Sequence, residues 1–186
     1  MASAKRRRAV FLDRDGVVIE EVNYLSHPDQ LKLVPGSARA IARLRKAGFT
    51  IVVVTNQSGV ARGYLTLKTL RQVHRLLDKR LQVQGAKLDA RYFCPHLPAQ
   101  AGKTGCSCRK PELGMLEKAQ KRFRLDLTRS YFVGDTTTDT LTAKRAGCTA
   151  VLVRTGKAGR DKVYRARPHK TCKDLAAAAD WIIKQA

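Results

Sequence analysis

Two aspartates near the amino terminus have the spacing of a phosphoryl-transfer pair. They lie in the sequence Asp13-Arg14-Asp15-Gly16, directly after a short apolar run. Residues i and i+2 at the end of a strand face the same side, and a glycine lets the chain turn away sharply. One carboxylate could attack phosphorus and form an aspartyl-phosphate, while the other protonates the leaving oxygen. Taken alone, the motif is equally an ordinary polar turn.

A third aspartate, Asp135, follows another apolar run and suits a magnesium site. Mg²⁺ is a hard cation that takes a few carboxylate oxygens together with phosphate and water. We expect Asp135 to share it with Asp13 and with the main-chain carbonyl of Asp15. Asp139 comes four residues later, in the first turn of a predicted helix. It could support the metal site or serve only as the negative charge that a helix amino terminus favours.

Two further segments offer ligands for a phosphoryl group and for zinc. In residues 55–59, a hydroxyl and an amide at the end of a strand, followed by main-chain N–H groups, could hold phosphoryl oxygens, although alone they also read as a turn. Three cysteines and a histidine lie close together as C-x-H and C-x-C pairs, which is the composition of a closed structural zinc site. These four residues are Cys94, His96, Cys106 and Cys108. Lys110, just after them, is placed to neutralise a phosphate.

The hydrophobic pattern places these motifs at the ends of strands. Near-continuous apolar runs predict strands at residues 9–12, 50–54, 91–94, 131–133 and 149–153. Helical spacing predicts helices between them: one capped by Ser37 and ended by Gly48, one over 67–81, one opened by Pro111, one over 137–146, and one capped by Asp174. The alternation predicts an α/β fold with a doubly wound parallel sheet, whose ligand lies beyond the carboxyl ends of the strands.

Length and composition exclude several classes of protein. The 186 residues suit a single domain, 1–186, in which we expect the basic residues 1–8 to form a flexible tail. At 44% hydrophobic the chain is too apolar to be disordered, and its apolar runs, at most residues 175–179, are far shorter than the ~18 that a membrane span needs. No signal-peptide core is visible, so we expect a cytosolic protein.

Cysteine use and charge bear on metals and partners. In a cytosolic chain, five cysteines favour a metal or a reactive thiol over disulfides, and Cys148 and Cys172 read as small apolar residues. The net charge of +22 favours an acidic partner, whether a phosphorylated metabolite, nucleic acid or anionic lipid. The basic runs are nevertheless most simply solvated faces, and we expect no membrane span and a monomer.

Taken together, the motifs FLDRDGVV, VVTNQSGVARG, YFCPHLP, CSCRKP and YFVGD resemble the haloacid dehalogenase superfamily of phosphatases, over residues 9–155. Within it they are similar to the group of heptose bisphosphate and histidinol phosphatases. The resemblance implies a Rossmann-like fold with a small zinc-binding loop and no large cap domain. It further implies an Mg²⁺-dependent enzyme that forms an aspartyl-phosphate on a phosphorylated sugar.

The resemblance also assigns roles residue by residue. It makes Asp13 the nucleophile and Asp15 the general acid and base, with Thr55 and Lys110 steadying the phosphoryl group. The residues that it implies for substrate binding are Glu21, Asn23, Tyr24, Asn56, Gln57, Ser58 and Arg109. It places Mg²⁺ on Asp13, Asp15 and Asp135, and Zn²⁺ on Cys94, His96, Cys106 and Cys108.

Four functions follow, and the sequence ranks them. The leading hypothesis is hydrolysis of the 7-phosphate of D-glycero-D-manno-heptose 1,7-bisphosphate, because TNQSGVARG and residues 114–116 look most like the heptose enzymes. Those enzymes commonly carry a lysine where this chain has Thr136, which favours histidinol-phosphate phosphatase as the alternative. The basic charge alone suggests a nucleic-acid 3′-phosphatase or a nucleic-acid-binding protein. The intact aspartates and Lys110 argue against a scaffold that only binds.

Overall fold

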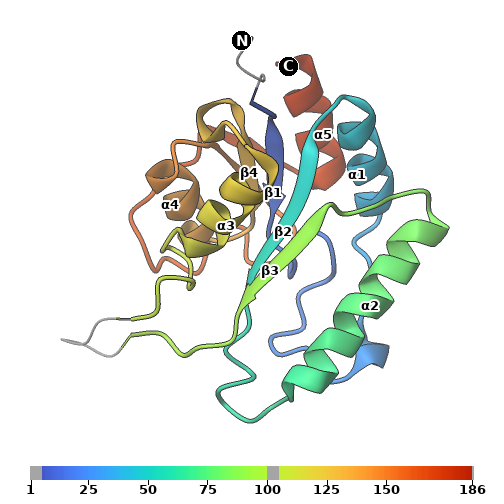
Figure 1. Cartoon of the computed structure of the whole chain (residues 1–186), viewed down its shortest axis with the longest axis vertical. Helices are drawn as coiled ribbons and strands as arrows, with labels where there is room; N and C mark the ends of the chain where they lie inside the picture. The colour runs from blue at the N-terminus through green and yellow to red at the C-terminus, as the bar shows by residue number, and fades with distance from the viewer. Residues whose placement is uncertain (1–5, 100–104, 186) are drawn as a thin grey trace.

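Six parallel strands form one sheet at the centre of the molecule (Figure 1). The computed structural model describes residues 6–99 and 105–185. The order in the sheet is β3-β2-β1-β4-β5-β6. The strands are β1 (Ala9–Leu12), β2 (Thr50–Asn56), β3 (Ala90–Cys94), β4 (Tyr131–Gly134), β5 (Thr149–Val153) and β6 (Lys170–Cys172). The chain winds outward from β1 in one direction and from β4 in the other, so the predicted doubly wound parallel sheet is confirmed.

Helices cover both faces of this sheet (Figure 1). Helices α1, α2 and α5 pack on one face, and α3 and α4 pack on the other. Their bounds are α1 (Ser37–Lys46), α2 (Leu67–Val83), α3 (Gly114–Phe123), α4 (Thr137–Arg145) and α5 (Leu175–Lys184), with short 3-10 turns η1 (Pro28–Gln30) and η2 (Leu127–Arg129). In the described part of the chain, the segment between β1 and α1 holds only η1, with no folded cap.

The apolar strands are buried because each strand supplies side chains to both faces. In β1, Val10 and Leu12 join the core beneath α1, α2 and α5, whereas Ala9 and Phe11 join the core beneath α3 and α4. All four side chains are fully buried. Alternation of side chains along a strand thus explains why β1 has no polar position.

The register of the central strands brings the predicted catalytic motifs together. Leu12 of β1 lies beside Val53 of β2 and Val133 of β4. The main-chain N–H of Asp13 donates to the carbonyl of Val133 at 3.0 Å, which extends the sheet by one residue. The residues that follow β1, β2 and β4 therefore meet at one edge, at the point where the winding direction reverses.

Two local predictions differ from the structure, and one strand was not predicted. Ser37 was expected to cap α1, but Gly36 occupies the cap position, and the Ser37 hydroxyl donates to the Val18 carbonyl at 3.0 Å instead. Pro111 was expected to open α3, which begins only at Gly114 because the intervening residues form a turn on the cysteine segment. The edge strand β6 was missed. The predicted Asp174 cap is confirmed, since its side chain accepts from the Ala177 N–H.

The predicted flexible tail falls largely outside the described residues, as 1–5 are not described. Arg7 and Arg8 are both held by the main chain. The N–H of Arg7 donates to the carbonyl of Arg124, and the carbonyl of Arg8 accepts from Thr50. The Arg8 guanidinium lies 4.7 Å from the centre of the Phe49 ring.

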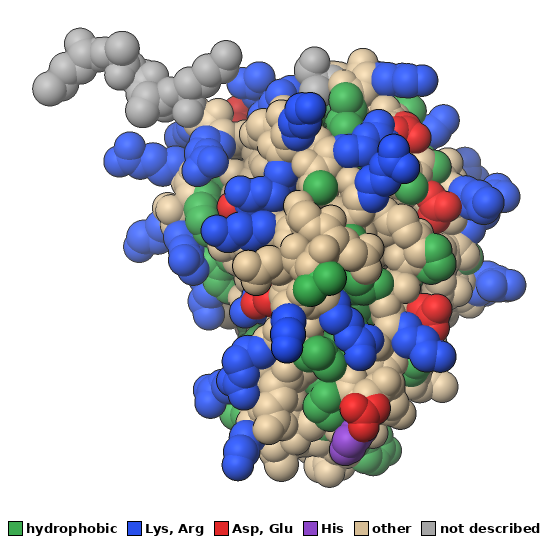
Figure 2. All heavy atoms as spheres, turned by 90° about the vertical axis from the view of Figure 1, so that its right-hand side faces the viewer, with side chains coloured by type: hydrophobic (Ala, Val, Ile, Leu, Met, Phe, Trp, Pro, Cys, Tyr) green, Lys and Arg blue, Asp and Glu red, His purple; other side chains and the backbone are tan. Residues whose placement is uncertain are grey.

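Exposed basic side chains are spread over one face of the molecule. Figure 2 shows many Lys and Arg side chains, with few acidic ones between them, on the face turned to the viewer. On α2 they follow the outward side of the helix at Lys68, Arg71, Arg75 and Lys79, all exposed. The prediction that this run is a solvated face is confirmed. Across the described residues, every helix is too short or too polar to cross a membrane.

Candidate active site

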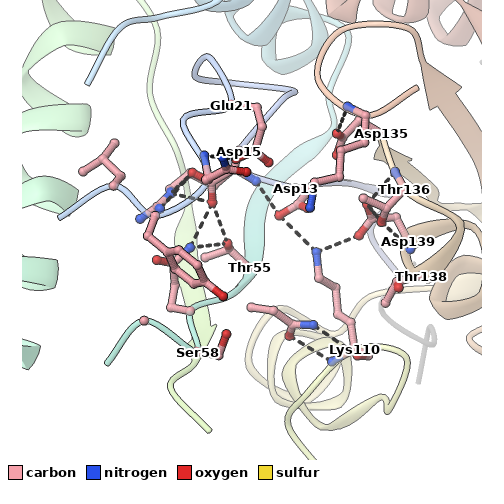
Figure 3. A pocket seen from close by; sticks show the side chains of 18 of the residues that line it. Asp13, Asp15, Glu21, Thr55, Ser58, Lys110, Asp135, Thr136, Thr138 and Asp139 are labelled. Atoms are coloured by element: carbon pink, nitrogen blue, oxygen red, sulfur yellow. Dashed lines mark hydrogen bonds and ion pairs between the residues drawn. The ribbon is translucent and has the colours of Figure 1, made fainter. Parts of the chain in front are cut away.

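A pocket of about 270 Å³ lies beyond the carboxyl ends of β1, β2 and β4 (Figure 3). Its walls come from segments far apart in the sequence, which the register of the sheet brings together. Every residue predicted for catalysis or substrate binding lines it: Asp13, Asp15, Glu21, Asn23, Tyr24, Thr55, Asn56, Gln57, Ser58, Arg109 and Lys110. Asp135 and Asp139 line it as well.

A buried lysine links two of the carboxylates at the centre of the pocket. The Lys110 Nζ lies 3.0 Å from an oxygen of Asp13 and 2.7 Å from an oxygen of Asp139. It also donates to the main-chain carbonyl of Val54. Burial lowers the pKa of Lys110, but the two carboxylates outweigh burial and raise it. Lys110 therefore stays charged and presents its ammonium group beside the predicted nucleophile.

Asp135 lies in a cradle of main chain. Its carboxylate accepts from the N–H of Lys157 at 2.6 Å. Gly16, with φ at +75°, and Gly156 approach it so closely that a Cβ on either would lie 2.6 Å or 2.3 Å from the same oxygen. Only glycine permits this backbone conformation and this contact at low cost. The glycine of the first motif thus makes room for the aspartate of the last.

The carboxylates of Asp13, Asp135 and Asp139 crowd together with little solvent. Oxygens from all three lie within 4.8 Å of one another. Burial raises the pKa of Asp13 well above its usual value, and Asp139 and Asp135 add to the effect while Lys110 opposes it. Burial and the charge of Asp139 raise the pKa of Asp135 to about 7. A divalent cation would relieve this repulsion, and an all-oxygen donor set fits Mg²⁺.

Asp15 lies outside this cluster, and its carboxylate faces hydrogen-bond donors. The Arg14 guanidinium donates from Nη2 at 2.9 Å and from Nε at 3.2 Å. On its other side, Gln57 Nε2 donates at 2.9 Å and the Thr55 hydroxyl at 3.3 Å. Its predicted contribution to a metal site is through the main-chain carbonyl, so both predictions for Asp15 can hold together.

The side chains of two predicted substrate-binding residues form hydrogen bonds with the protein's own main chain. The Asn56 amide donates to the carbonyl of Lys110 at 3.1 Å and accepts from its N–H at 3.0 Å. Asn56 therefore fixes the backbone from which the lysine projects. Arg109 donates to the carbonyl of His96 at 2.9 Å. That contact ties the pocket wall to the cysteine segment.

The segment after the first motif forms one rim of the pocket. Glu21 accepts from the N–H of Asn23 at 2.6 Å, which holds Asn23 in a left-handed conformation. Burial, followed by the charge of Asp15, raises the pKa of Glu21. The Tyr24 ring meets Tyr64 edge to face, with 4.8 Å between ring centres. The rim thus offers one carboxyl group and an exposed aromatic pair to a substrate.

The four predicted zinc ligands form a compact cluster beside the pocket. The Cys106 Sγ lies 3.4 Å from the Sγ of Cys94 and of Cys108, and the His96 Nδ1 lies 3.5 Å and 3.3 Å from those two sulfurs. A tetrahedron with Zn–S bonds of about 2.3 Å has edges of about 3.8 Å, so only small shifts would seat the ion. The loop between the two pairs includes residues 100–104, which lie outside the described residues.

Three residues at this site were not predicted from the sequence. Arg14 stands inside the first motif, yet its burial, at 1% exposed, was not anticipated. His74 contacts Arg14 from the buried face of α2. Its position among Leu70, Val73 and Leu77 on one face of the predicted helix could have indicated that His74 is buried. Lys157 lines the pocket from a loop without a motif.

Comparison with known proteins gives a consistent group of relatives. A sequence model of the HAD-hydrolase-like family matches residues 107–178. A D-glycero-D-manno-heptose-1,7-bisphosphate 7-phosphatase from Thermosynechococcus vestitus is 42% identical, over 95% of each chain. A D-glycero-beta-D-manno-heptose-1,7-bisphosphate 7-phosphatase from Bordetella bronchiseptica is 39% identical, over 96% of this chain and 99% of the other.

Solved structures of similar proteins have the same fold. The D,D-heptose 1,7-bisphosphate phosphatase from B. bronchiseptica, complexed with magnesium and phosphate, matches with a TM-score of 0.87 and 38% identity, over 96% of this chain and 99% of the other. The enzyme of that name from Burkholderia thailandensis matches with a TM-score of 0.70 and 30% identity, over 95% and 99%.

Proposed function

This chain belongs to the haloacid dehalogenase-like phosphatases, and from that membership we propose that it hydrolyses the 7-phosphate of D-glycero-D-manno-heptose 1,7-bisphosphate. The observation that carries the proposal is the ion pair of Lys110 with Asp13, in which a buried cation lies beside the carboxylate that we propose as the nucleophile. A phosphoryl group on Asp13 would lie against that ammonium.

We assign the two chemical steps to two carboxyl groups. In the first, an Asp13 oxygen attacks phosphorus, the bond to the sugar oxygen breaks, and Asp15 gives that oxygen a proton. In the second, Asp15 takes a proton from a water molecule that attacks phosphorus, and the bond to Asp13 breaks. Lys110 neutralises the phosphoryl oxygens in both, and Thr55, Gln57 and Ser58 line the same pocket.

Asp13, Asp135 and the main-chain carbonyl of Asp15 would hold Mg²⁺, and the raised pKa values of the two carboxyl groups support this assignment. Such an ion supplies positive charge to the phosphoryl oxygens. The B. bronchiseptica relative was solved with magnesium and phosphate. Asp139 binds Lys110 and accepts a hydrogen bond from the N–H of Thr136 at the start of α4. It would therefore support the site through Lys110.

The choice of substrate is tested by a turnover screen. Purified protein with Mg²⁺ is given heptose 1,7-bisphosphate, histidinol phosphate, other sugar phosphates and a 3′-phosphorylated oligonucleotide, and phosphate release is measured. We expect the heptose bisphosphate to have the highest kcat/KM. Preference for histidinol phosphate would replace the substrate assignment and point to Thr136, which lines the pocket where the heptose enzymes commonly have lysine. No turnover of any phosphomonoester would overturn the function.

We also propose that Cys94, His96, Cys106 and Cys108 hold one structural Zn²⁺. Four protein ligands saturate a tetrahedral ion and leave no position for an activated water. The role of the ion would be to fix the direction in which the chain leaves Cys108 toward Lys110. A misplacement of ~1 Å can cost on the order of 10²-fold in rate.

Cys108→Ser is therefore expected to lose zinc, lower kcat and raise KM while the sheet stays folded. Cys148→Ser, at a buried cysteine outside the cluster, is the matched control and should keep its zinc. Metal content by elemental analysis and steady-state kinetics on both variants check this. A zinc-free Cys108→Ser protein with unchanged turnover would show that the ion does not position the active site.

A further inference from the structure

Arg14 is a buried cation that the proposed chemistry does not use. Its side chain is 1% exposed and forms one wall of the pocket. Nε and Nη2 both point at the carboxylate of Asp15, with the closest approach 2.9 Å. A guanidinium holds a planar fork of donors, so its orientation decides where the carboxylate must lie.

The far end of this guanidinium meets His74 on α2. Nη1 lies 3.4 Å from His74 Nε2. Arginine only donates hydrogen bonds, so Nε2 must accept and the ring proton must be on Nδ1. Burial, followed by the charges of Arg14 and Arg91, lowers the pKa of His74 to about 3. The imidazole is therefore a neutral acceptor at any pH at which the protein would work.

The ring of His74 is itself held in place. It is 5% exposed, and its centre lies 5.6 Å from that of the Phe93 ring on β3. The contact with Arg14 thus joins α2 and β3 to the first motif. On the opposite side of Asp15, the Gln57 amide donates both to the carboxylate and to the Thr55 hydroxyl. The carboxylate is held between two fixed groups.

We propose that His74 and Arg14 are positioning residues for the general acid, so that His74 orients the guanidinium and the guanidinium orients Asp15. The inference rests on the proposed function. When Asp15 gives its proton to the departing sugar oxygen, the carboxylate that results is already paired with Arg14. When it later takes a proton from water, it does so from the same fixed position. Neither residue touches the substrate in this scheme.

The test uses the dependence of the rate on the leaving group. A sugar phosphate has an alkoxide leaving group that needs a proton, whereas p-nitrophenolate leaves without one. His74→Phe keeps a ring to pack against Phe93 but removes the acceptor, and His74→Gln returns an amide oxygen near the position of Nε2. Single-turnover rates with enzyme in excess report the first step alone for each substrate.

We expect His74→Phe to lower the first-step rate on the preferred sugar phosphate about 10-fold, a part of the ~10²–10⁴ that general acid catalysis supplies. KM and the rate with p-nitrophenyl phosphate should stay near wild type, and His74→Gln should recover most of the loss. Arg14→Lys, which keeps the charge without the fork, should show the same selective loss and serves if His74→Phe does not fold.

Equal losses on both substrates, no loss, or no recovery in His74→Gln would overturn the inference. These outcomes are separable from failure of the proposed function itself. In that case the wild-type protein would release phosphate from neither substrate.

Discussion

Asp13→Asn is expected to abolish phosphate release, with a loss on the order of 10⁵–10⁶-fold, the scale on which a covalent enzyme loses rate without its nucleophile. An amide oxygen cannot form the acyl phosphate. It can still accept from the N–H of Arg14 and from Lys110, the two donors that contact the Asp13 oxygen at 2.7 and 3.0 Å. The variant should therefore fold normally, which thermal unfolding followed by circular dichroism would check.

Asp15→Asn is the natural comparison for that variant, because it removes the proposed proton donor and leaves the proposed nucleophile. Its expected loss is smaller, ~10²–10⁴-fold. Full activity of Asp13→Asn would show that Asp13 is not the nucleophile and would contradict the roles assigned to Asp13 and Asp15.

Lys110→Met is expected to lose stability as well as turnover. The Lys110 side chain is 2% exposed and balances the carboxylates of Asp13 and Asp139. Removing one partner of a buried ion pair leaves uncompensated charge and costs about 3–5 kcal/mol in the free energy of unfolding. Methionine would preserve most of the packing against Phe132, so the loss would report charge rather than a cavity.

Urea unfolding at neutral pH measures the effect, with Lys157→Met as the matched control. Lys157 lines the same pocket but is exposed, and its contact with Asp135 is made by its main-chain N–H, which the substitution keeps. Adding Asp139→Asn to Lys110→Met should recover part of the stability, since it removes one of the unpaired charges. Equal stability of the two single variants would contradict the balance of charge described for the pocket.

The sheet was predictable because its strands are buried on both faces. An apolar run such as β1 or β5 needs no tertiary information, and both were predicted with their observed bounds. Strand β6 has two exposed residues of three and no apolar run, so it can be recognised only from its pairing with β5 in the structure. The predicted start of α3 was wrong for a related reason. A main-chain contact between residues 107 and 114 forms a turn, so the helix begins only beyond the proline.

The members of the pocket were predictable, whereas the pairings among them were not. Residue type and position after a strand pointed to Asp13, Thr55 and Asp135. The partners of Asn56 and Asp139 depend on where Lys110 arrives from a distant segment, and the sequence does not show this. Asp139 fills the helix-terminus role, because it completes the capping box of α4, and it also binds Lys110. Its support of a metal site stays a prediction.

The most direct test of the account is to locate the phosphoryl group during turnover. Borohydride reduces an aspartyl-phosphate to homoserine, and trypsin separates Asp13 on peptide 9–14 from Asp15 on the next peptide, because it cuts after Arg8 and Arg14. Protein turning over the bisphosphate with Mg²⁺ is quenched, reduced, digested and analysed by mass spectrometry. We expect homoserine at position 13 in the wild-type protein and none in Asp13→Asn. Homoserine at position 15, or phosphate release with neither position reduced, would contradict it.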